Sequence, residues 1–441
     1  MTNKRRLAVG AVAASAALVL AGCANGGNSA SDSQTVTLRL WDENAAAVYR
    51  TIAEDFEAQN SGIDVEVETV PWADYFSGLR QEVAAGQGPD IFWLNGANFA
   101  AYVAAGQVAP VKDVIGEDAA ARFVPAVVDQ YSSKGELYGI PQIFDGGIGL
   151  FYNADLLKEA GVDPAELQNL KWSATGGEDT LLPLLQKLTK DSAGRNALDP
   201  EFDANNVVQY GFNSAWDIQA ILLPFIGSNG GTFQNGEQFT FSTPETEAAF
   251  KYIVDLVDTY HVAPPAADTN NNGDFSRDAF LQGRMALFQS GTYNLTNVND
   301  SVSFEWGIAP LPAGDAGAVT VAPGVSALIN AASANDEAVK AFAKYLSTAA
   351  GNRPFGEAGV AFPAVSEAGD AFQSFWSAAG VDISALVVAA DQTVIEPVTG
   401  TKFNEAAEVF MPIMREMFLG QRPVSEAVAE ADRVANEVVN G

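Results

Sequence analysis

The sequence predicts an α/β protein in which helices flank a mostly parallel sheet. Extended segments with an apolar residue at every second position alternate with segments of helical periodicity, and such a βαβαβ succession is typical of parallel sheets. The chain has 441 residues, enough for two or three domains of about 150 residues each. Hydrophobic residues make up 48% and aromatic residues 10%, so the composition is that of a folded protein with sizeable cores.

The first part of the chain supplies the clearest elements. Residues 36–41 and 63–69 place apolar side chains at alternate positions, as half-buried strands do. Between them, residues 45–59 carry apolar residues four positions apart, which predicts a helix with one buried face. A second helix is predicted at residues 75–83, and a short buried strand follows at residues 91–94.

The later elements are less regular. Residues 138–152 contain two extended runs on either side of Asp145, Gly146 and Gly147, where the glycines permit a turn or a close backbone approach. Pro412 lies inside an apolar helical segment and predicts a kink or two shorter helices there. Helices are predicted at residues 246–260, 336–350, 405–419 and 425–439.

The first 22 residues have the form of an export signal. Basic residues at positions 4–6 precede an uncharged apolar run at positions 7–20, which is short for a bilayer span. The run ends in Leu20, Ala21, Gly22 and Cys23, which resemble the bacterial lipoprotein box. The resemblance implies that Cys23 becomes the lipid-modified first residue of an exported protein, anchored to the outer face of the cell membrane. Residues 23–34 are expected to form a flexible tether, because they are rich in Gly, Ser, Asn and Ala. The alternative is that Cys23 is an incidental residue beside an ordinary cleavage site.

Cysteine content and charge limit the function classes. Cys23 is the only cysteine, so the protein carries no internal disulfide and relies on its core. The formal charge is −31 and becomes −34 when the leader, with three basic residues and no acidic ones, is removed. Such a surface repels phosphate backbones and anionic ligands, which argues against nucleic acid as a partner and favours a neutral ligand. The acidity is also compatible with a role in solubility alone.

Six segments in chain order carry a family resemblance. They are residues 38–44 (LRLWDEN), 86–94 (GQGPDIFWL), 138–153 (YGIPQIFDGGIGLFYN), 227–233 (GSNGGTF), 283–295 (GRMALFQSGTYNL) and 322–332 (APGVSALINAA). In this order they resemble the extracellular solute-binding proteins of ABC importers, in the sugar-binding branch that includes the maltodextrin-binding proteins. The resemblance covers nearly the whole chain after the leader.

The resemblance implies a two-lobed periplasmic-binding-protein-like fold, in which each lobe is a mostly parallel sheet flanked by helices. Two or three strands are expected to cross between the lobes, which close over a ligand in the cleft. Lobe 1 is expected at residues 35–144 and 312–346, and lobe 2 at residues 145–311 and 347–441. The implied function is to bind a neutral carbohydrate and to deliver it to the permease subunits of an importer. We expect this carbohydrate to be an oligosaccharide. We expect a monomer without a cofactor.

A sugar site needs flat aromatic rings for the C–H faces of a pyranose and short polar side chains for its hydroxyl groups. The sequence supplies both at the ends of strands, where open α/β sheets bind ligands. Asp145 lies at the first expected crossover, where the family often accepts a hydroxyl hydrogen bond. Trp216 and Tyr293 lie near glycine turns, where family members commonly stack aromatic rings on sugars. The full set of expected ligand-binding residues is Asp42, Glu43, Trp93, Asn95, Asp145, Trp216, Tyr293, Gly324, Phe403 and Asn404, the last two by family position only.

Several of these residues have a structural alternative. Asp42 and Glu43 are placed to cap the helix that begins near residue 45, where a carboxylate favours the positive helix end. Trp93 belongs to a plainly buried strand, whereas Trp41 is able to face either side of its strand. Gly324 either brings backbone close to the ligand or permits a turn.

One polar loop has part of a calcium-binding pattern. Asp268, Asn270, Asn272 and Gly273 occupy positions 1, 3, 5 and 6 of such a loop. Position 12 is Ala279, where the pattern requires a bidentate Glu. We therefore expect a polar surface loop that leads into a capped helix, and no metal is predicted.

Enzyme classes find less support in the sequence. His261 is the only histidine, which excludes His-rich metal sites, and there is no phosphate loop, nucleophile elbow or dinucleotide fingerprint. The strongest rival is an exported glycoside hydrolase or lyase, because two carboxylates suffice for glycoside hydrolysis and the chain has 55 acidic residues. A third class is a peptide- or polyamine-binding protein of the same fold, because Asp42, Glu43 and Asp145 suit a cation.

Overall fold

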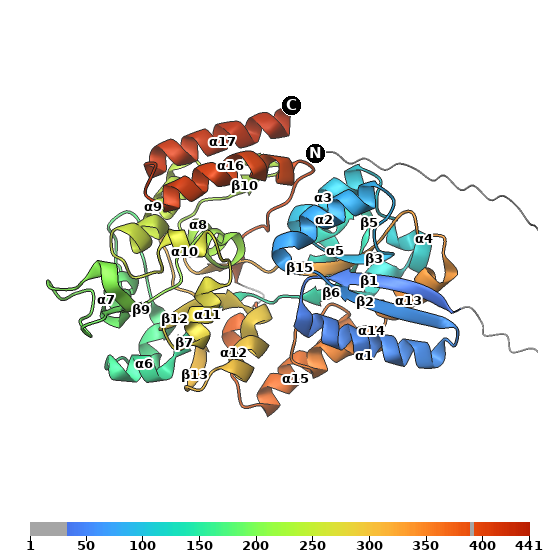
Figure 1. Cartoon of the computed structure of the whole chain (residues 1–441), viewed down its shortest axis with the longest axis horizontal. Coiled ribbons are helices and arrows are strands. Elements are labelled where there is room, and N and C mark those ends of the chain that lie inside the picture. Colours follow the sequence, from blue (N-terminus) through green and yellow to red (C-terminus); the bar gives the residue numbers. More distant parts are fainter. Residues whose placement is uncertain (1–32, 389–391) are drawn as a thin grey trace, which may run out of the picture.

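The computed structural model describes residues 33–388 and 392–441. The expected signal peptide, Cys23 and the tether up to residue 32 lie outside the described residues. None of the described helices has both the length and the apolar composition that crossing a bilayer requires. The described chain forms two lobes that lie side by side, and the C-terminal helices pack on the second lobe (Figure 1).

Lobe 1 is built on a six-stranded sheet. Its strands are β1 (Gln34–Leu40), β2 (Ile63–Thr69), β3 (Ile91–Asn95), β6 (Gly139–Phe144), β15 (Gly324–Ile329) and β16 (Phe362–Pro363), in the order β16-β6-β15-β3-β1-β2. β1 is parallel to β2 and β3, whereas β15 is antiparallel to both β3 and β6. The sheet is therefore mixed rather than mostly parallel, because β15 returns from lobe 2 and enters between β3 and β6 in the opposite direction.

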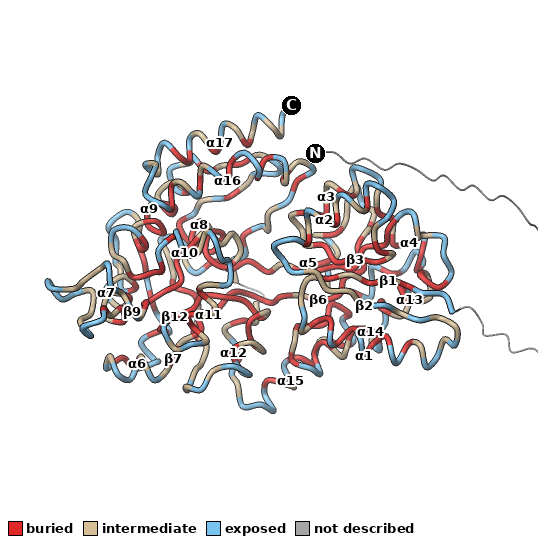
Figure 2. The backbone as a smooth tube through the Cα atoms, viewed as in Figure 1, coloured by how far each residue is buried: buried red, intermediate tan, exposed pale blue. Residues whose placement is uncertain are grey.

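Amphipathic helices cover this sheet. The alternation in β1 buries Val36, Leu38 and Leu40, and the helices pack their apolar faces against such residues. The main ones are α1 (Glu43–Gln59), α2 (Trp72–Ala84), α3 (Gly96–Ala104), α5 (Pro125–Gln130), α13 (Glu337–Leu346) and α14 (Ala349–Glu357). Figure 2 shows the buried positions concentrated along the central strands and on the inner faces of the helices.

The sheet of lobe 2 is antiparallel, which corrects the expectation of a mostly parallel one. Its strands are β7 (Ile148–Asn153), β12 (Leu287–Gly291) and β13 (Trp306–Ala309), in the order β12-β7-β13. β7 comes directly from the crossover and pairs antiparallel with both neighbours. The sequence predicts an extended run at β7 but not the strands β12 and β13, and the insertion of β7 between them is decided by tertiary packing.

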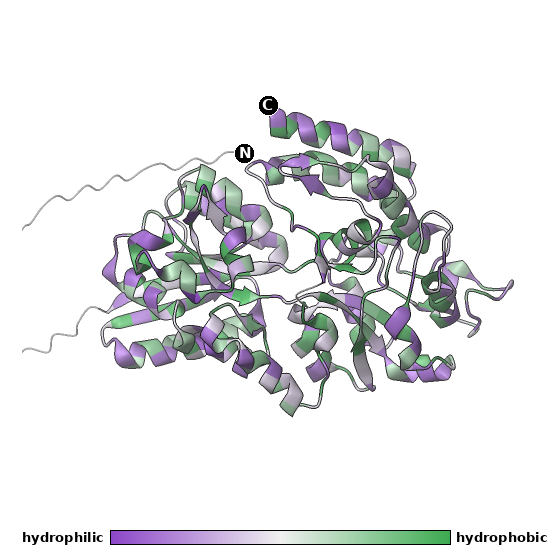
Figure 3. Cartoon of the chain, turned by 180° about the vertical axis from the view of Figure 1, so that it is seen from behind, coloured by the Kyte–Doolittle hydropathy of each residue, from purple (hydrophilic) through white to green (hydrophobic). Residues whose placement is uncertain are grey.

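Two long C-terminal helices close lobe 2. α16 (Phe403–Phe418) and α17 (Val424–Asn440) lie side by side and pack on α9 (Pro244–Asp258) (Figure 1). α16 runs through Pro412 as one helix rather than two, because the carbonyl that loses its bond belongs to Glu408, an exposed residue. Seen from behind, the outer helices alternate hydrophilic and hydrophobic residues, as helices with one buried face do (Figure 3).

The chain crosses between the lobes more than once, and the observed boundaries differ from the expected ones. It leaves β6 through residues 145–147 and returns to β15 through residues 321–323, after the short strand β14 (Val319–Thr320). Val319 and Val321 pack in the core of lobe 2, although residues 312–346 were expected in lobe 1. Phe355 and Val365 pack in the core of lobe 1, because α14 lies against α1.

Candidate functional site

The edge of the lobe 1 sheet that faces lobe 2 collects polar and aromatic side chains. β6 runs in the same direction as β1, β2 and β3, because the antiparallel β15 separates it from β3. The carboxyl ends of these four strands therefore lie along one edge, from which the chain departs for lobe 2 at Asp145. Asp42, Trp72 and Asn95 follow shortly after the other strands or end them at the same edge. Ligands of open α/β sheets bind at such an edge.

Asp42 caps helix α1 and is close to lobe 2. Its Oδ1 accepts a hydrogen bond from the backbone N–H of Ala45 at 2.7 Å. Burial raises the pKa of Asp42, and the positive charge of Arg277, on α11 (Phe275–Leu281) of lobe 2, opposes this increase. Glu43 is exposed and accepts a hydrogen bond from Thr69 Oγ1 at 2.6 Å, within lobe 1. Contact of Glu43 with a ligand stays a prediction.

Asp145 is a buried carboxyl with an unused acceptor. Its side chain is 7% exposed, and its Oδ1 has no hydrogen-bond partner within the described residues. The backbone is fixed from both lobes, because its N–H donates to Pro323 O and its carbonyl accepts from Thr292 Oγ1, both at 2.9 Å. Burial raises the pKa of Asp145 to about 7, and the nearby charge of Asp42 adds to the increase. Such a carboxyl offers an acceptor to a hydroxyl-bearing ligand.

Tyr293 brings an aromatic ring from lobe 2 to the same region. It follows β12, whose last residue Gly291 pairs with Ile148, the first residue of β7 after the crossover. A Cβ at Gly291 would lie 2.4 Å from the ring of Tyr293, so glycine is needed for the ring to pack there. Burial raises the pKa of Tyr293, with further increases from the charges of Asp217 and Asp145. The charges of both carboxylates thus act on the same phenol group.

Trp216 and Asp217 stand together before a helical turn of lobe 2. Trp216 is half-buried, with ring centroids 6.3 Å from Phe410 and 6.1 Å from Phe418, both on α16. Asp217 Oδ1 accepts hydrogen bonds from the N–H groups at the start of the turn Ile218–Leu222, including that of Ala220 at 2.8 Å. Burial raises the pKa of Asp217. The turn thus presents an indole ring and a carboxylate as neighbours.

Hydrogen bonds of amide and hydroxyl side chains connect helix α1 of lobe 1 to lobe 2. Asn44 Nδ2, on α1, donates to Thr296 Oγ1 at 3.3 Å and to Asn297 Oδ1 at 3.2 Å. Both acceptors lie on α12 (Leu295–Ser301) of lobe 2. Asn297 Nδ2 is also 3.5 Å from the backbone carbonyl of Tyr293, so this contact adjoins the aromatic residue of the site.

A second contact joins the lobes at α3 and α16. Asn404 Nδ2 donates to Asn98 Oδ1 at 3.0 Å, and Asn98 Nδ2 donates to Asn95 Oδ1 at 2.8 Å. Asn95 also caps α3, accepting from the backbone N–H of Asn98 at 3.2 Å. We call this contact and that of Asn44 the interlobe amide contacts. They show the two lobes in direct apposition.

Three expected ligand-binding residues are placed in the interior. Trp93 is 1% exposed and its Nε1 donates to Tyr49 Oη at 2.7 Å, so it supports the lobe 1 core rather than presenting a ring to a ligand. Phe403 is buried among aromatic rings of the lobe 2 core. Gly324 is packed against α5, where an added Cβ would lie 2.6 Å from Val127. The sequence places these three residues at the ends of strands or helices, but it does not show which side chains of other elements cover them.

Sequence reasoning missed three polar residues that the structure brings to this region. They are Asn44, Asn98 and Asp217. Each is a short polar residue close in sequence to an expected site residue, and each follows the end of a strand or precedes a helix. That proximity was the available signal, but it does not reveal the partners of Asn44 and Asn98, which lie some 250 to 300 positions away.

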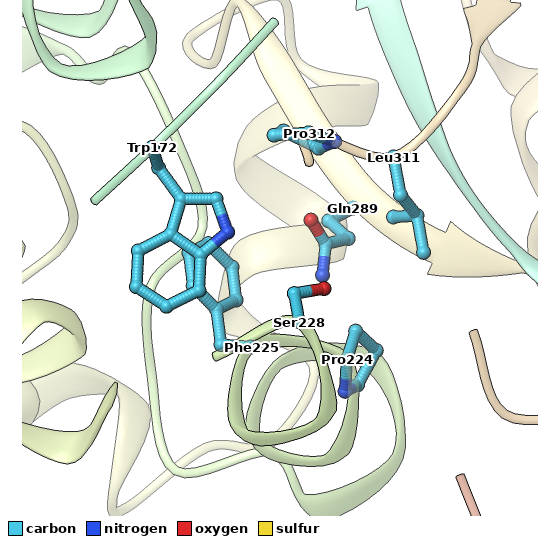
Figure 4. A pocket seen from close by; sticks show the side chains of 7 residues that line it. All are labelled: Trp172, Pro224, Phe225, Ser228, Gln289, Leu311 and Pro312. Atoms are coloured by element: carbon cyan, nitrogen blue, oxygen red, sulfur yellow. The ribbon is translucent and has the colours of Figure 1, made fainter. Parts of the chain in front are cut away.

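Two cavities in the described residues lie within lobe 2 and are lined by none of the expected site residues. The first, lined by Trp172, Phe225 and Gln289 among others, is too narrow for a water molecule (Figure 4). The second is an open pocket of about 540 Å³ beside Tyr210 and His261. Neither of these two cavities is the expected ligand site.

The partial calcium pattern forms ordinary polar surface structure. The short helix α10 (Ala266–Thr269) overlaps the start of the expected polar loop, and α11 follows it, but the side chain of Asp274 makes no capping hydrogen bond to α11. Asp274 forms an ion pair with Arg277 at 3.0 Å, and Asn272 Oδ1 accepts from the backbone N–H of Asp274. The described residues contain no group of three or more His, Cys, Asp or Glu side chains arranged to hold a metal ion.

Comparison with known proteins gives consistent matches. Residues 41–353 match the family model described as bacterial extracellular solute-binding protein. The maltotriose-binding protein of Pyrococcus abyssi is 25% identical over 272 residues, which cover 61% of this chain and about half, 51%, of that relative. The crystal structure of M. tuberculosis UspC is 46% identical with a TM-score of 0.72, covering 92% of this chain and 100% of that one. Lmo0181 of Listeria monocytogenes, an ABC substrate-binding protein in complex with cycloalternan, shares the fold at 20% identity, with a TM-score of 0.78 and coverage of 93% and 100%.

Proposed function

The chain belongs to the bacterial extracellular solute-binding protein family, and we propose that it binds a neutral carbohydrate between its lobes and delivers it to the permease of an ABC importer. The proposal is supported by the position of Asp145 at the crossover. Thr292 of lobe 2, the neighbour of Tyr293, donates a hydrogen bond to the backbone carbonyl of Asp145, and the charge of Asp42 of lobe 1 contributes to the raised pKa of Asp145. The names of relatives that bind maltotriose or are solved with cycloalternan agree with a sugar ligand.

The residues suit the two kinds of surface that a sugar presents. The rings of Trp216 and Tyr293 offer flat apolar faces to C–H groups, and each is held in place by neighbours. Asp145 Oδ1 offers an acceptor to a hydroxyl group, because it lacks a partner within the described residues. A hydroxyl that fills this position removes the cost of an unsatisfied buried oxygen. A neutral guest also adds no further negative charge near Asp42 and Asp217.

Ligand binding is proposed to favour the closed arrangement of the lobes. A guest that touches Asp42 in lobe 1 and Tyr293 in lobe 2 interacts with both lobes only when they are close, so it stabilises the closed state. The interlobe amide contacts of Asn44 and Asn404 stabilise the same state. The closed protein then docks on the permease as a monomer.

The test is a binding and turnover assay on the purified protein. Intrinsic tryptophan fluorescence and calorimetry are followed against mono- to tetrasaccharides of the maltose, cellulose and mannan series. We expect saturable binding of at least one series and unchanged saccharide after prolonged incubation. Release of shorter sugars would instead support a glycoside hydrolase or lyase, and absence of binding to every saccharide would contradict the proposal.

A cationic ligand is the second candidate, favoured by the acidic character of the site. Asp42, Asp145 and Asp217 lie in one electrostatically connected region, which suits a polyamine or a basic peptide. Spermidine and a lysine-rich tripeptide therefore belong in the same titration. Tighter binding of either than of every sugar would favour this candidate.

The membrane anchor is proposed for Cys23. Its support is the match of residues 20–23 to the lipoprotein box. Expression with labelled palmitate tests it: the wild-type chain should carry label in the membrane fraction, and Cys23→Ala should carry none and leave that fraction. Equal labelling of both proteins would contradict the anchor.

A further inference from the structure

Trp72 is an exposed aromatic residue at the edge described above that was not among the expected ligand-binding residues. Its side chain is 55% exposed, and it is the only aromatic among the exposed large apolar side chains of residues 33–388 and 392–441. A single exposed apolar residue is ordinary on a protein surface. Trp72 is distinguished by how its ring is held and by where it lies.

The indole of Trp72 is fixed by two aromatic neighbours. Its centroid lies 5.3 Å from that of Trp41 and 4.8 Å from that of Phe76, and both pairs meet nearly edge to face, at 81° and 86°. Trp41 in turn packs edge-on against the buried Trp93, with centroids 5.2 Å apart. The exposed ring thus stands on an aromatic support that reaches the core of lobe 1. A ring held in this way loses little conformational entropy when a ligand packs on it.

Trp72 and Asp145 mark two separated points of the ligand-facing edge. Trp72 begins α2 just after β2, the outermost strand, whereas Asp145 follows β6. Four interstrand steps separate β6 from β2, and at about 4.8 Å each they span roughly 19 Å. Asp42 and Asn95 lie between them, after β1 and at the end of β3. The edge therefore carries polar groups in its middle and a free aromatic surface at one end.

We infer that the ligand is an oligosaccharide that lies along this edge, with one ring near Asp145 and Tyr293 and an outer ring on Trp72. This inference rests on the proposed function. A single pyranose is too short to reach both places, so Trp72 contributes to the binding of longer chains only. Its contribution comes from apolar contact with the C–H face of the outer ring. Trp72 thereby sets a preference for ligand length.

The experiment compares ligand lengths in the wild-type protein and in Trp72→Ala by calorimetry. The probes are the mono- to tetrasaccharides of the maltose, cellulose and mannan series. In the series that binds, wild-type affinity is expected to rise with length. Trp72→Ala is expected to weaken tetrasaccharide binding by roughly three- to tenfold and to leave binding of the shortest bound member unchanged. Trp72→Phe, which keeps a ring, should retain most of the wild-type affinity.

The control variant is Leu198→Ala, because Leu198 is equally exposed, at 55%, but lies in lobe 2 away from this edge. It should bind every length as the wild-type protein does. If Trp72→Ala lowers the melting temperature, the tetrasaccharide affinities of Trp72→Phe and Trp72→Leu are compared instead. Both variants keep an apolar residue at the position, but only Trp72→Phe keeps a ring. Equal tetrasaccharide affinity in the ring-containing and ring-free proteins, or no rise with length in the wild-type protein, would overturn the inference while the proposed function stands. Failure of the wild-type protein to bind any saccharide would overturn both.

Discussion

Asp145→Asn is expected to make the ligand-free protein more stable at pH 8 while weakening ligand binding. The carboxyl is buried, and its Oδ1 has no partner within the described residues. Burial, followed by the charge of Asp42, raises its pKa from 3.8 to about 7. The folded state therefore holds this proton more tightly than the unfolded state does. Its contribution to stability is complete below pH 4 and is lost progressively as the pH rises to about 7.

The size of the effect follows from the pKa difference. A difference of about three units corresponds to roughly 4 kcal/mol of lost stability above pH 7, of which roughly 2 kcal/mol or more is lost between pH 5 and pH 8. The asparagine amide keeps the shape of the side chain and does not ionise. The stability gained by Asp145→Asn should therefore be larger at pH 8 than at pH 5 by about 2 kcal/mol.

The assay is the free energy of unfolding in urea for the two proteins at pH 5 and pH 8. Asp300→Asn, at an exposed position on α12, is the matched control and should show no such pH dependence. At pH 8, Asp145→Asn should also bind the saccharide at least tenfold more weakly, because a charged acceptor is lost. A stability gain that is equal at both pH values would show that the pKa of Asp145 is not raised by burial, and an unchanged Kd would show that Asp145 does not bind the ligand.

Three further variants test the site from both lobes. Trp216→Ala is expected to weaken sugar binding by more than about tenfold, and an unchanged Kd in calorimetry would reject stacking on this ring. Asn404→Ala removes one interlobe hydrogen bond, of about 1 kcal/mol, and should weaken saccharide binding about fivefold. It should also enlarge the radius of gyration of the ligand-free protein in X-ray scattering, and an identical scattering curve would contradict a role of Asn404 in closure. Gly291→Ala places a methyl group against Tyr293 and should displace that ring, which should weaken saccharide binding. The melting temperature of the double mutant that carries Gly291→Ala and Trp216→Ala should differ little from those of the two single mutants. Full retention of affinity in Gly291→Ala would show that the ring position is not needed.

Local patterns predicted the first strands of lobe 1 closely, whereas the helix expected at 336–350 is divided into α13 and α14. The strand expected at 36–41 is Gln34–Leu40, and the strand expected at 63–69 is Ile63–Thr69. These strands have one apolar and one polar face, so alternation reports directly on burial. Strand neighbours were less predictable, since β15 and β7 take their places through crossings that no local pattern encodes.

The same contrast holds for the site. Asp42, Asn95 and Asp145 lie at the interlobe edge because they follow or end strands that share a direction, which the sequence order suggests. The burial of Trp93, on β3, depends on Tyr49, on α1, because the hydroxyl of Tyr49 accepts a hydrogen bond from the indole N–H of Trp93. The contact between Asn98 and Asn404 joins residues in different lobes. Positions at strand ends are thus readable from sequence, whereas the partner that covers or bonds each side chain is a property of the folded chain.

In the proposed function, side chains from both lobes enclose a carbohydrate. A crystal structure of the protein with the tightest-binding saccharide of the titration series is the decisive measurement. We expect a sugar hydroxyl within hydrogen-bond distance of Asp145 Oδ1 and pyranose rings against Trp216 and Tyr293. A saccharide bound elsewhere, such as in the pocket beside His261, with Asp145 Oδ1 still unpartnered, would show that the proposed site is wrong.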